Sequence, residues 1–154
     1  IRCLEKHIAL GEKLDMPLFL HERSAAEDFV KRFKRHPEIC AKSVVHCFTG
    51  NKATLDKYLN MGFSIGITGW ICDDFRGREL REAVSLIPLD RILVETDAPY
   101  LTPKNVPGLS RTNVPRNVKY VAGELARHMK VEEDVLAENA RRNTERIFGI
   151  SNKH

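Results

Sequence analysis

The chain has 154 residues, of which 42% are hydrophobic and 30% charged, and its formal net charge is +4. This is the composition of an ordinary globular domain that is long enough to bury a core. No apolar run approaches the length that spans a membrane, and no secretory signal pattern opens the chain, so we expect no membrane partner. The modest positive charge permits a polyanionic partner but is not evidence for one.

The chain opens on a helical pattern. Ile1, Leu4, Ile8 and Leu14 recur at roughly helical spacing. Neither an initiator methionine nor an N-cap residue precedes them. We therefore interpret the chain as the later portion of a longer domain that lacks its front.

Four apolar runs follow and predict the strands of a parallel sheet. They read MPLFLHERS, KSVVHCFTG, GFSIGITGW and RILVETDAP, and they end at His21, His46, Thr68–Gly69 and Asp97. The steps between these ends are 25, 23 and 28 residues. That length accommodates one strand, one helix and two loops, so the chain is predicted to be an α/β protein made of βα units.

The segments between the runs predict amphipathic helices that pack on the sheet. Their inward residues are Phe29, Val30 and Phe33, then Leu55, Tyr58 and Leu59, then Leu80, Ala83, Val84 and Ile87, and finally Val118, Val121 and Leu125. The expected helix boundaries are a capping box at Ser24–Glu27, a stop at Pro37, Asp73–Asp74 at the third start, and Asn113 as the cap before Pro115. A last helix is expected at about 132–147, ending at Gly149.

The cysteines give no metal or redox motif. Cys3, Cys40, Cys47 and Cys72 contain no C-x-x-C pair and lie in or beside apolar stretches. We expect reduced, mostly buried thiols and a reducing compartment, the cytoplasm or alternatively the nucleus. No glycine-rich phosphate loop is present, which argues against a nucleotide-binding site of that kind. The proline-bearing loop 99–113 is expected to fold over the acidic strand end that it follows.

Two histidines and an aspartate stand at equivalent strand ends. Asp97 alone could be a structural acid, and a lone histidine on an apolar strand is usually a core residue. Because the carboxyl ends of parallel strands meet at one edge, His21, His46 and Asp97 together favour a metal site. Imidazole and carboxylate suit zinc, manganese or a similar divalent ion, and a carboxylate beside the activated water can take its proton.

Two other side chains are candidates for substrate contact. Arg23 follows His21 by two residues and so points the same way, where it could bind a phosphate; the alternative is an ion pair with a neighbouring glutamate. Trp70 follows the third strand and could stack a base, or else pack beneath a loop. The basic stretch 31–36 lies on a helix and is interpreted as a solvated face rather than a DNA track.

The ordered motifs resemble the TatD family of metal-dependent deoxyribonucleases. The matching pieces cover nearly all of the chain and read LFLHERSA, VVHCFTG, GFSIGITGWICDDFRGRELRE, IPLDRILVETDAPYLTP and ENARRNTERIFGI. The resemblance implies a TIM-type (β/α)8 barrel and a DNase that trims DNA ends, often 3′ to 5′. It implies that His21 and His46 are metal ligands and that Asp97 contacts both metal and water. Glu95 would contact the metal ligands without binding the metal itself, and Asn113 also matches the family motif.

The chain departs from the family pattern in two places. The early His-x-His motif and the bridging glutamate are absent, so residues 1–154 are interpreted as the C-terminal half of one barrel, strands five to eight. The complete barrel would hold two divalent ions (Mg, Zn or Mn), and this piece alone is expected to be inactive or nearly so. The loop reads RTNVP where relatives have Arg-Asn-Glu-Pro, so Val114 cannot make a glutamate's contacts.

Two alternative functions remain open. The first is an amide or ester hydrolase of the same barrel group, since activated water serves either bond. The second is a non-catalytic fragment that pairs with a partner, or with itself, through the exposed sheet edges of a half-barrel. If the partner is DNA, weak sequence specificity is expected, because no helix-turn-helix, zinc-finger or RNA-recognition signature is present.

Overall fold

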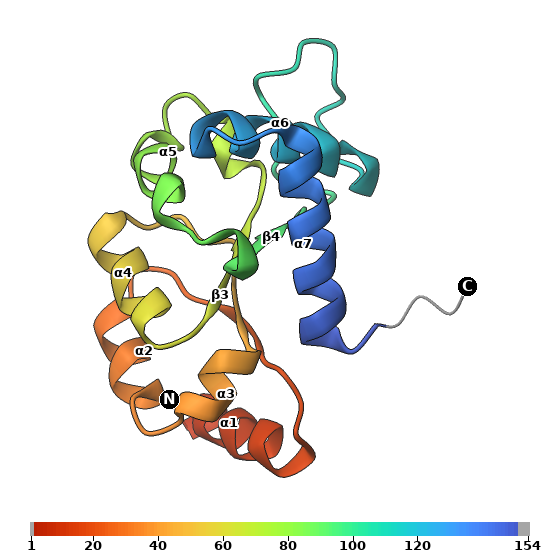
Figure 1. The fold of residues 1–154 in the computed structure, drawn as a ribbon. Coiled ribbons are helices and arrows are strands. Elements are labelled where there is room, and N and C mark those ends of the chain that lie inside the picture. The colour runs from red at the N-terminus through yellow and green to blue at the C-terminus, as the bar shows by residue number, and fades with distance from the viewer. Residues whose placement is uncertain (1, 151–154) are drawn as a thin grey trace.

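A computed structural model describes residues 2–150 of the chain, in which four short parallel strands alternate with helices (Figure 1). The sheet has the order β1-β2-β3-β4, so each strand lies beside its successor, as the βα repeat predicted. The predicted α/β class is therefore confirmed. The elements are α1 (Arg2–Leu14), β1 (Phe19–His21), α2 (Ala26–Phe33), α3 (Pro37–Lys42), β2 (Val44–His46), α4 (Lys52–Asn60), β3 (Ser64–Ile67), α5 (Arg78–Ala83), β4 (Ile92–Val94), α6 (Val118–Met129) and α7 (Glu133–Phe148), with 3₁₀ turns η1 (Gly69–Cys72), η2 (Val84–Leu86), η3 (Leu89–Arg91) and η4 (Pro115–Asn117).

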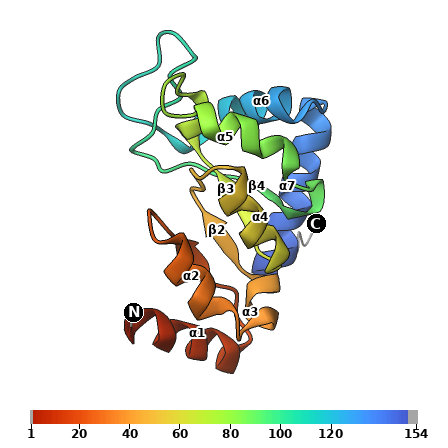
Figure 2. The same cartoon turned by 90° about the vertical axis from the view of Figure 1, so that its left-hand side faces the viewer.

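The elements are stacked in the order of the strands. In both ribbon views α1 and α3 lie at one end of the molecule, while α5, α6 and the long loop after β4 lie at the other (Figures 1 and 2). Each strand is thus followed by its own helix, and the first and last strands lie at the two edges of the sheet.

The two faces of the sheet have different roles. Leu20 pairs with Val45 and Ile65 with Ile92, and these side chains are buried in the main core with the helices. Successive residues of a strand point to opposite faces. The other face therefore carries His21 and its register partner His46. On this second face Val44 and Leu93 pack with Ile147 of α7, and the polar groups stand at the strand ends.

The core is richest in aromatic side chains near β1 and β2. Phe33 and Tyr58 are fully buried, and Phe63 contacts both rings edge to face. These residues come from α2, α4 and the segment before β3, so their packing joins three βα units. Phe29, Phe33, Leu55 and Tyr58 were predicted to face inward, and all four are buried.

Two predicted helix boundaries are wrong around α2. Ser24 has a φ of 57° and is not the cap; α2 is instead preceded by Ala25, whose N–H donates to Glu22 Oε1 at 2.6 Å. Glu22 thus accepts the N–H of the N-cap residue, which in a capping box is the part of the glutamate three residues further on. The helix ends at Phe33, ahead of Pro37, and Pro37 opens α3, since a proline fits the first turn of a helix, where its missing N–H is not needed.

The third connection also differs from the prediction. Asp73 does not begin a helix; its Oδ1 accepts the N–H groups of Phe75 and Arg76 and so closes a tight turn. The helix α5 begins only at Arg78, after Gly77. By contrast, α7 ends at Phe148 and Gly149 follows in the left-handed conformation, as predicted.

The long loop 99–113 folds over the strand ends, in agreement with the prediction. A Cβ at Gly69 would lie 2.2 Å from Leu101 O, so only glycine permits this close approach. Asn113 is buried and its Nδ2 donates to Tyr100 O and Thr96 Oγ1. Asn113 therefore braces the loop and does not cap a helix by itself. The first turn after it, Pro115–Asn117, is 3₁₀.

The remaining predictions concern the N-terminal helix, the cysteines and the membrane. In α1 Ile8 is buried, whereas Leu14 is exposed; Ile1 lies outside the described residues. Cys40, Cys47 and Cys72 are buried free thiols and Cys3 is an exposed one, as expected. Within residues 2–150, no helix combines the length and the apolar character that crossing a membrane requires.

A buried carboxylate on α6 ties that helix to its surroundings. The side chain of Glu124 is 9% exposed and pairs with Arg127 at 2.5 Å and His128 at 2.9 Å. It also accepts from Asn105 of the long loop. Burial alone would raise the pKa of Glu124, but the hydrogen bonds from Arg127 and His128 outweigh it and lower the pKa below its ordinary value.

We expect Glu124→Gln to destabilise the fold by about 1–3 kcal/mol at pH 7, since it weakens buried charge-assisted hydrogen bonds. Because the pKa in the folded state is lower than in the unfolded state, this stabilisation is present above the ordinary pKa of 4.5 and is lost as the pH falls through the folded-state value. Urea unfolding of both proteins at pH 7 and at pH 3 measures it. An equal difference at both pH values would contradict the assignment.

Candidate metal centre

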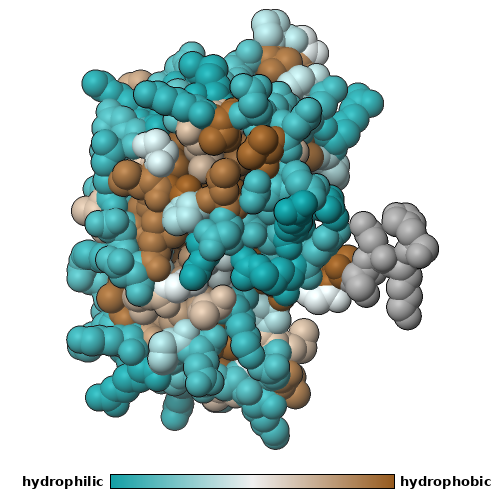
Figure 3. Space-filling model, viewed as in Figure 1, coloured by the Kyte–Doolittle hydropathy of each residue, from teal (hydrophilic) through white to brown (hydrophobic). Residues whose placement is uncertain are grey.

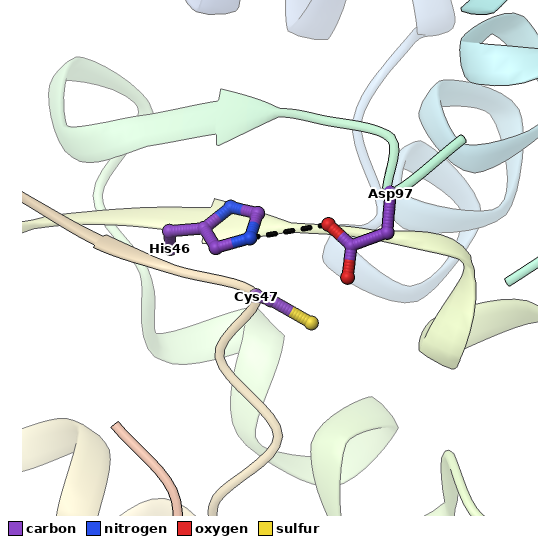
Figure 4. A group of neighbouring side chains, drawn as sticks. All are labelled: His46, Cys47 and Asp97. Carbon is purple, nitrogen blue, oxygen red and sulfur yellow. Dashed lines mark ion pairs between the residues drawn. The ribbon is translucent and has the colours of Figure 1, made fainter. Parts of the chain in front are cut away.

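The ends of β2 and β4 bring a histidine and an aspartate together. His46 is the last residue of β2, and Asp97 lies three residues beyond the end of β4. His46 Nε2 lies 3.1 Å from Asp97 Oδ1, and Figure 4 shows the ring edge directed at the carboxylate. The two side chains are 17% and 26% exposed, so the pair is sheltered but still reachable from solvent. The predicted meeting of these two residues is therefore what the structure shows.

Glu95 holds the other side of the histidine ring. Its Oε2 lies 2.8 Å from His46 Nδ1 and 3.2 Å from the backbone N of Cys47, which donates to it. The carboxylate lies directly over Gly66 of β3, where a Cβ would come within 2.2 Å of it. The glycine thus provides the space in which Glu95 reaches from β4 across β3 to β2.

The ring of His46 is therefore placed between two carboxylates. The hydrogen bond that the ring donates to Glu95 raises the pKa of His46 above its ordinary value, burial opposes this rise, and the charge of Asp97 adds to it. If Glu95 accepts the Nδ1 proton, Nε2 faces Asp97 with a lone pair. That arrangement is repulsive unless Nε2 carries a proton or a cation lies between the two groups. The geometry accordingly calls for a positive charge at this point.

Cys47 joins the group because the backbone turns sharply after β2. Its φ is 50°, so the strict alternation of a strand is broken and consecutive side chains reach the same region. One ligand atom from each of His46, Cys47 and Asp97 lies within 4.8 Å of the others. Burial raises the pKa of Cys47 to about 11, and its sulfur lies 3.2 Å from Thr68 Oγ1. The thiol is therefore neutral near pH 7 and is a weaker ligand than its neighbours.

Cys47 was not among the metal ligands predicted from the sequence, although it directly follows His46 in the HCFTG segment. Its adjacency to a proposed ligand was the only available signal. An extended strand would have pointed it to the opposite face, and only the left-handed backbone of Cys47 reverses that expectation.

The donor set fits a divalent metal ion. Two ligands at about 2.0–2.2 Å from one ion lie roughly 3 Å or slightly more apart, which matches the 3.1 Å between His46 Nε2 and Asp97 Oδ1. Glu95 Oε1 is buried and has no hydrogen-bond partner among the described residues, so an acceptor remains unsatisfied beside the pair. Glu95 behind His46 is also the arrangement that orients a metal-binding imidazole.

His21 lies near this centre but outside the close group. Its ring centroid is 5.9 Å from that of His46, and the side chain is exposed on the edge strand β1. The structure thus brings His46, Asp97 and Glu95 into contact and leaves His21 alongside them. Asn113 makes its contacts within the long loop, and Val114, whose N–H donates to Asn113 Oδ1, is exposed.

Arg23 has no carboxylate within 4.0 Å among residues 2–150, contrary to the alternative of an ion pair with a neighbouring glutamate. Glu22 instead binds Ala25 N and the hydroxyl of Tyr58. The guanidinium of Arg23 lies over the ring of Trp70, with its Cζ 5.8 Å from the centroid. It is available for an anion.

Fold and site together define an α/β protein with a metal-competent centre at the carboxyl ends of a parallel sheet. A family model described as "TatD related DNase" matches residues 1–149. The chain therefore belongs to the TatD-related DNase family.

Similar proteins agree with this assignment. The chain is 43% identical over 152 residues to a protein of Erwinia amylovora named 3'-5' ssDNA/RNA exonuclease TatD, covering 97% of this chain and 59% of that protein. It is 40% identical over 146 residues to the protein of the same name from a Rahnella species, covering 94% of this chain and 56% of the relative. The chain thus spans less than two thirds of the length of the curated relatives it matches.

Solved structures show the same fold. The TatD homologue YJJV of Escherichia coli superposes with a TM-score of 0.85 at 27% identity, over 96% of this chain and 56% of that one. An uncharacterized amidohydrolase of Saccharomyces cerevisiae superposes with a TM-score of 0.79 at 25% identity, over 94% and 58%.

Proposed function

We propose that the whole protein to which these residues belong is a metal-dependent phosphodiesterase that removes nucleotides from single-stranded DNA or RNA ends. The observation that carries this proposal is His46, placed between the carboxylates of Asp97 and Glu95 at the carboxyl ends of the sheet. The names of the Erwinia and Rahnella relatives, exonucleases acting on ssDNA and RNA, support the substrate class. We expect this cleavage to show weak sequence preference. We also expect it to take place in a reducing compartment, such as the cytoplasm.

The residues of this chain have distinct roles in such a reaction. His46 and Asp97 would hold a divalent ion, with His21 as a further ligand. The bound ion would supply Lewis acidity that makes a neighbouring water acidic near neutral pH. Asp97 is placed to accept the proton of that water. Glu95 fixes the orientation and the tautomer of His46. Arg23 presents an unpaired guanidinium to a phosphate.

We further propose that residues 1–154 form the C-terminal half of a TIM-type (β/α)8 barrel domain. The four-stranded parallel sheet and the coverage of 56–59% of the relatives support this architecture. A complete barrel needs about 250 residues. Asp97 and the two histidines alone are too few to hold the two ions of the complete barrel. The isolated chain is therefore expected to bind one ion weakly and to cut DNA poorly or not at all.

Two surfaces fit the contact with the remaining part of a barrel. On edge strand β1 Phe19 is 53% exposed, and on the β4 side a groove of about 390 Å³ lies between α6 and α7. Apolar surface also gathers in a patch between α5 and α7, surrounded by polar side chains (Figure 3). An open sheet edge beside apolar surface is a site of association. This supports pairing of the chain with further strands, from a longer chain or from a second copy.

The proposal is tested by joining the chain to the preceding segment of the Erwinia amylovora relative and assaying a 5′-labelled single strand with Mg²⁺, Mn²⁺ or Zn²⁺. We expect stepwise shortening by the chimaera, no shortening by its His46→Ala variant, and little by the 154-residue chain alone. Robust cleavage by the isolated chain would refute its proposed inactivity. A folded, metal-bound chimaera that cuts no strand would refute the nuclease function.

The amide or ester hydrolase remains the rival function. Bis(4-nitrophenyl) phosphate and 4-nitrophenyl acetate, given to the same chimaera, distinguish the two bonds. Arg23 beside the centre favours the phosphodiester, because a free guanidinium binds phosphate oxygens. A preference for the acetate that depends on His46 would favour the rival.

A further inference from the structure

Two guanidinium groups lie over the ring of the same tryptophan. The Cζ of Arg76 is 5.1 Å from the Trp70 ring centroid and that of Arg23 is 5.8 Å from it, both within cation–π range. Arg23 comes from the connection after β1, whereas Trp70 and Arg76 come from the connection after β3. The contact therefore spans the carboxyl ends of the sheet on both sides of β2, the strand that carries His46.

Neither guanidinium group has an acidic partner in the part of the chain that the structure describes. Asp73 and Asp74 precede Arg76 closely in the sequence, but Asp73 pairs with Lys104 and Asp74 with Arg81. Among residues 2–150 no carboxylate lies within ion-pair distance of Arg76, just as none does for Arg23. Their positive charges are not neutralised within the described part of the chain.

The turn that carries Arg76 is held firmly. Asp73 Oδ1 accepts the N–H of Phe75 at 3.1 Å and that of Arg76 at 3.0 Å, and Gly77 N donates to Asp73 O at 2.8 Å. The hydrogen bond from Arg76 N is the main reason that the pKa of Asp73 is lowered, and Lys104 lowers it further. The turn presents Phe75 outward with 92% of its surface exposed.

We propose that Arg23, Trp70, Phe75 and Arg76 form the surface that holds a single-stranded nucleic acid beside the centre. This inference rests on the proposed nuclease function. The guanidinium groups contact backbone phosphates, and the exposed ring of Phe75 and the ring of Trp70 stack bases. Unpaired cations interleaved with aromatic rings are the means by which single strands are bound without sequence preference.

The strand is expected to lie over Trp70 and Arg76 and to avoid a cavity that Arg23 helps to line. That cavity has a volume of about 600 Å³, and its lining includes four acidic residues, Glu22, Glu27, Asp28 and Glu79, of which Glu27 pairs with Lys57. Like charges repel, so this acidic wall disfavours a phosphate backbone. The charges thus favour a path of the nucleic acid from Arg23 toward Trp70 and Arg76.

The test uses Trp70 as its own reporter, because it is the only tryptophan among the 154 residues. The chain is titrated in EDTA, which prevents cleavage, with a ten-residue oligothymidylate and with an abasic strand of equal length. We expect the oligothymidylate to quench the fluorescence of Trp70 and to bind more tightly than the abasic strand. Arg76→Gln should weaken binding roughly tenfold and reduce the slope of log K against log salt by about 0.7, the loss of one phosphate contact.

Arg35→Gln is the matched control. The substitution removes the same charge as Arg76→Gln does. Arg35 follows the C-terminal end of α2, whereas the N-terminal end of α2 is the one near the metal centre, so Arg35 lies toward the amino ends of the strands. We expect it to change the affinity less than twofold. Circular dichroism checks the folding of each variant. Phe75→Ser, at a fully solvated position, should weaken binding of the oligothymidylate and leave binding of the abasic strand unchanged.

The inference is overturned if the oligonucleotide does not bind, if it saturates without a change in Trp70 fluorescence, or if Arg76→Gln and Arg35→Gln weaken binding equally. The nuclease proposal is judged separately, on the chimaera with metal. Binding at this surface without any cleavage would refute only the proposed nuclease function. Cleavage with an unchanged KM in Arg76→Gln would refute only the proposed binding surface.

Discussion

His46→Ala is expected to abolish specific binding of a divalent ion by this chain. The substitution removes Nε2, which lies 3.1 Å from Asp97 Oδ1, and it leaves Asp97 and Glu95 facing each other without a positive group between them. Isothermal titration with Zn²⁺ and Mn²⁺ measures the effect, and we expect the affinity to fall by at least about a hundredfold. Glu95→Gln, which acts only through the orientation of His46, should reduce it by roughly 10–100-fold.

His36→Ala is the control for this experiment. His36 also pairs with a glutamate, since its Nδ1 lies 2.6 Å from Glu12 Oε1, but this pair joins α1 to the start of α3, away from the sheet. Its loss should leave the metal affinity unchanged. Equal stoichiometry and affinity in the wild type and in His46→Ala would show that the ion binds elsewhere.

Gly66→Ala is expected to disrupt the same centre without altering any ligand. A Cβ at this position would lie 2.2 Å from the carboxylate of Glu95, far below any normal contact. Glu95 must then leave its place, so His46 Nδ1 and the N–H of Cys47 lose their acceptor. We expect about 1–3 kcal/mol of destabilisation in urea unfolding and a roughly tenfold or greater loss of metal affinity.

A double-mutant cycle tests the stated cause. In a Glu95→Ala background the clash is gone, so Gly66→Ala should cost much less than it does in the wild type. Gly123→Ala in α6 is a control, because a Cβ there would meet only the far end of the Glu133 side chain, at 3.2 Å. It should be neutral or slightly stabilising, since alanine favours a helix over glycine. Additive effects of the two substitutions would exclude the proposed contact between Gly66 and Glu95.

Local sequence patterns predicted the elements well where apolar periodicity decides. The runs that end at His21 and His46 became β1 and β2 with those same last residues, and α7 ends at Phe148, with Gly149 as its left-handed cap, as expected. Predictions of helix starts were weaker. Ser24 lost its role as a cap because Glu22 reaches Ala25 N, and Asp73 closes a turn instead of beginning α5. Such competition between nearby side chains cannot be read from spacing alone.

The sequence by itself determined that a histidine and an aspartate meet at one end of a parallel sheet, because βα units of regular length place successive strand ends side by side. It did not determine which neighbours complete the centre. Glu95 reaches His46 only because Gly66 leaves space for it, and Cys47 turns inward only through its left-handed backbone. The approach of Arg23 and Arg76 to the ring of Trp70 likewise depends on a turn and on two separate connections. The tertiary structure decided these contacts, since each joins residues from different connections or depends on a backbone conformation that hydrophobic periodicity does not encode.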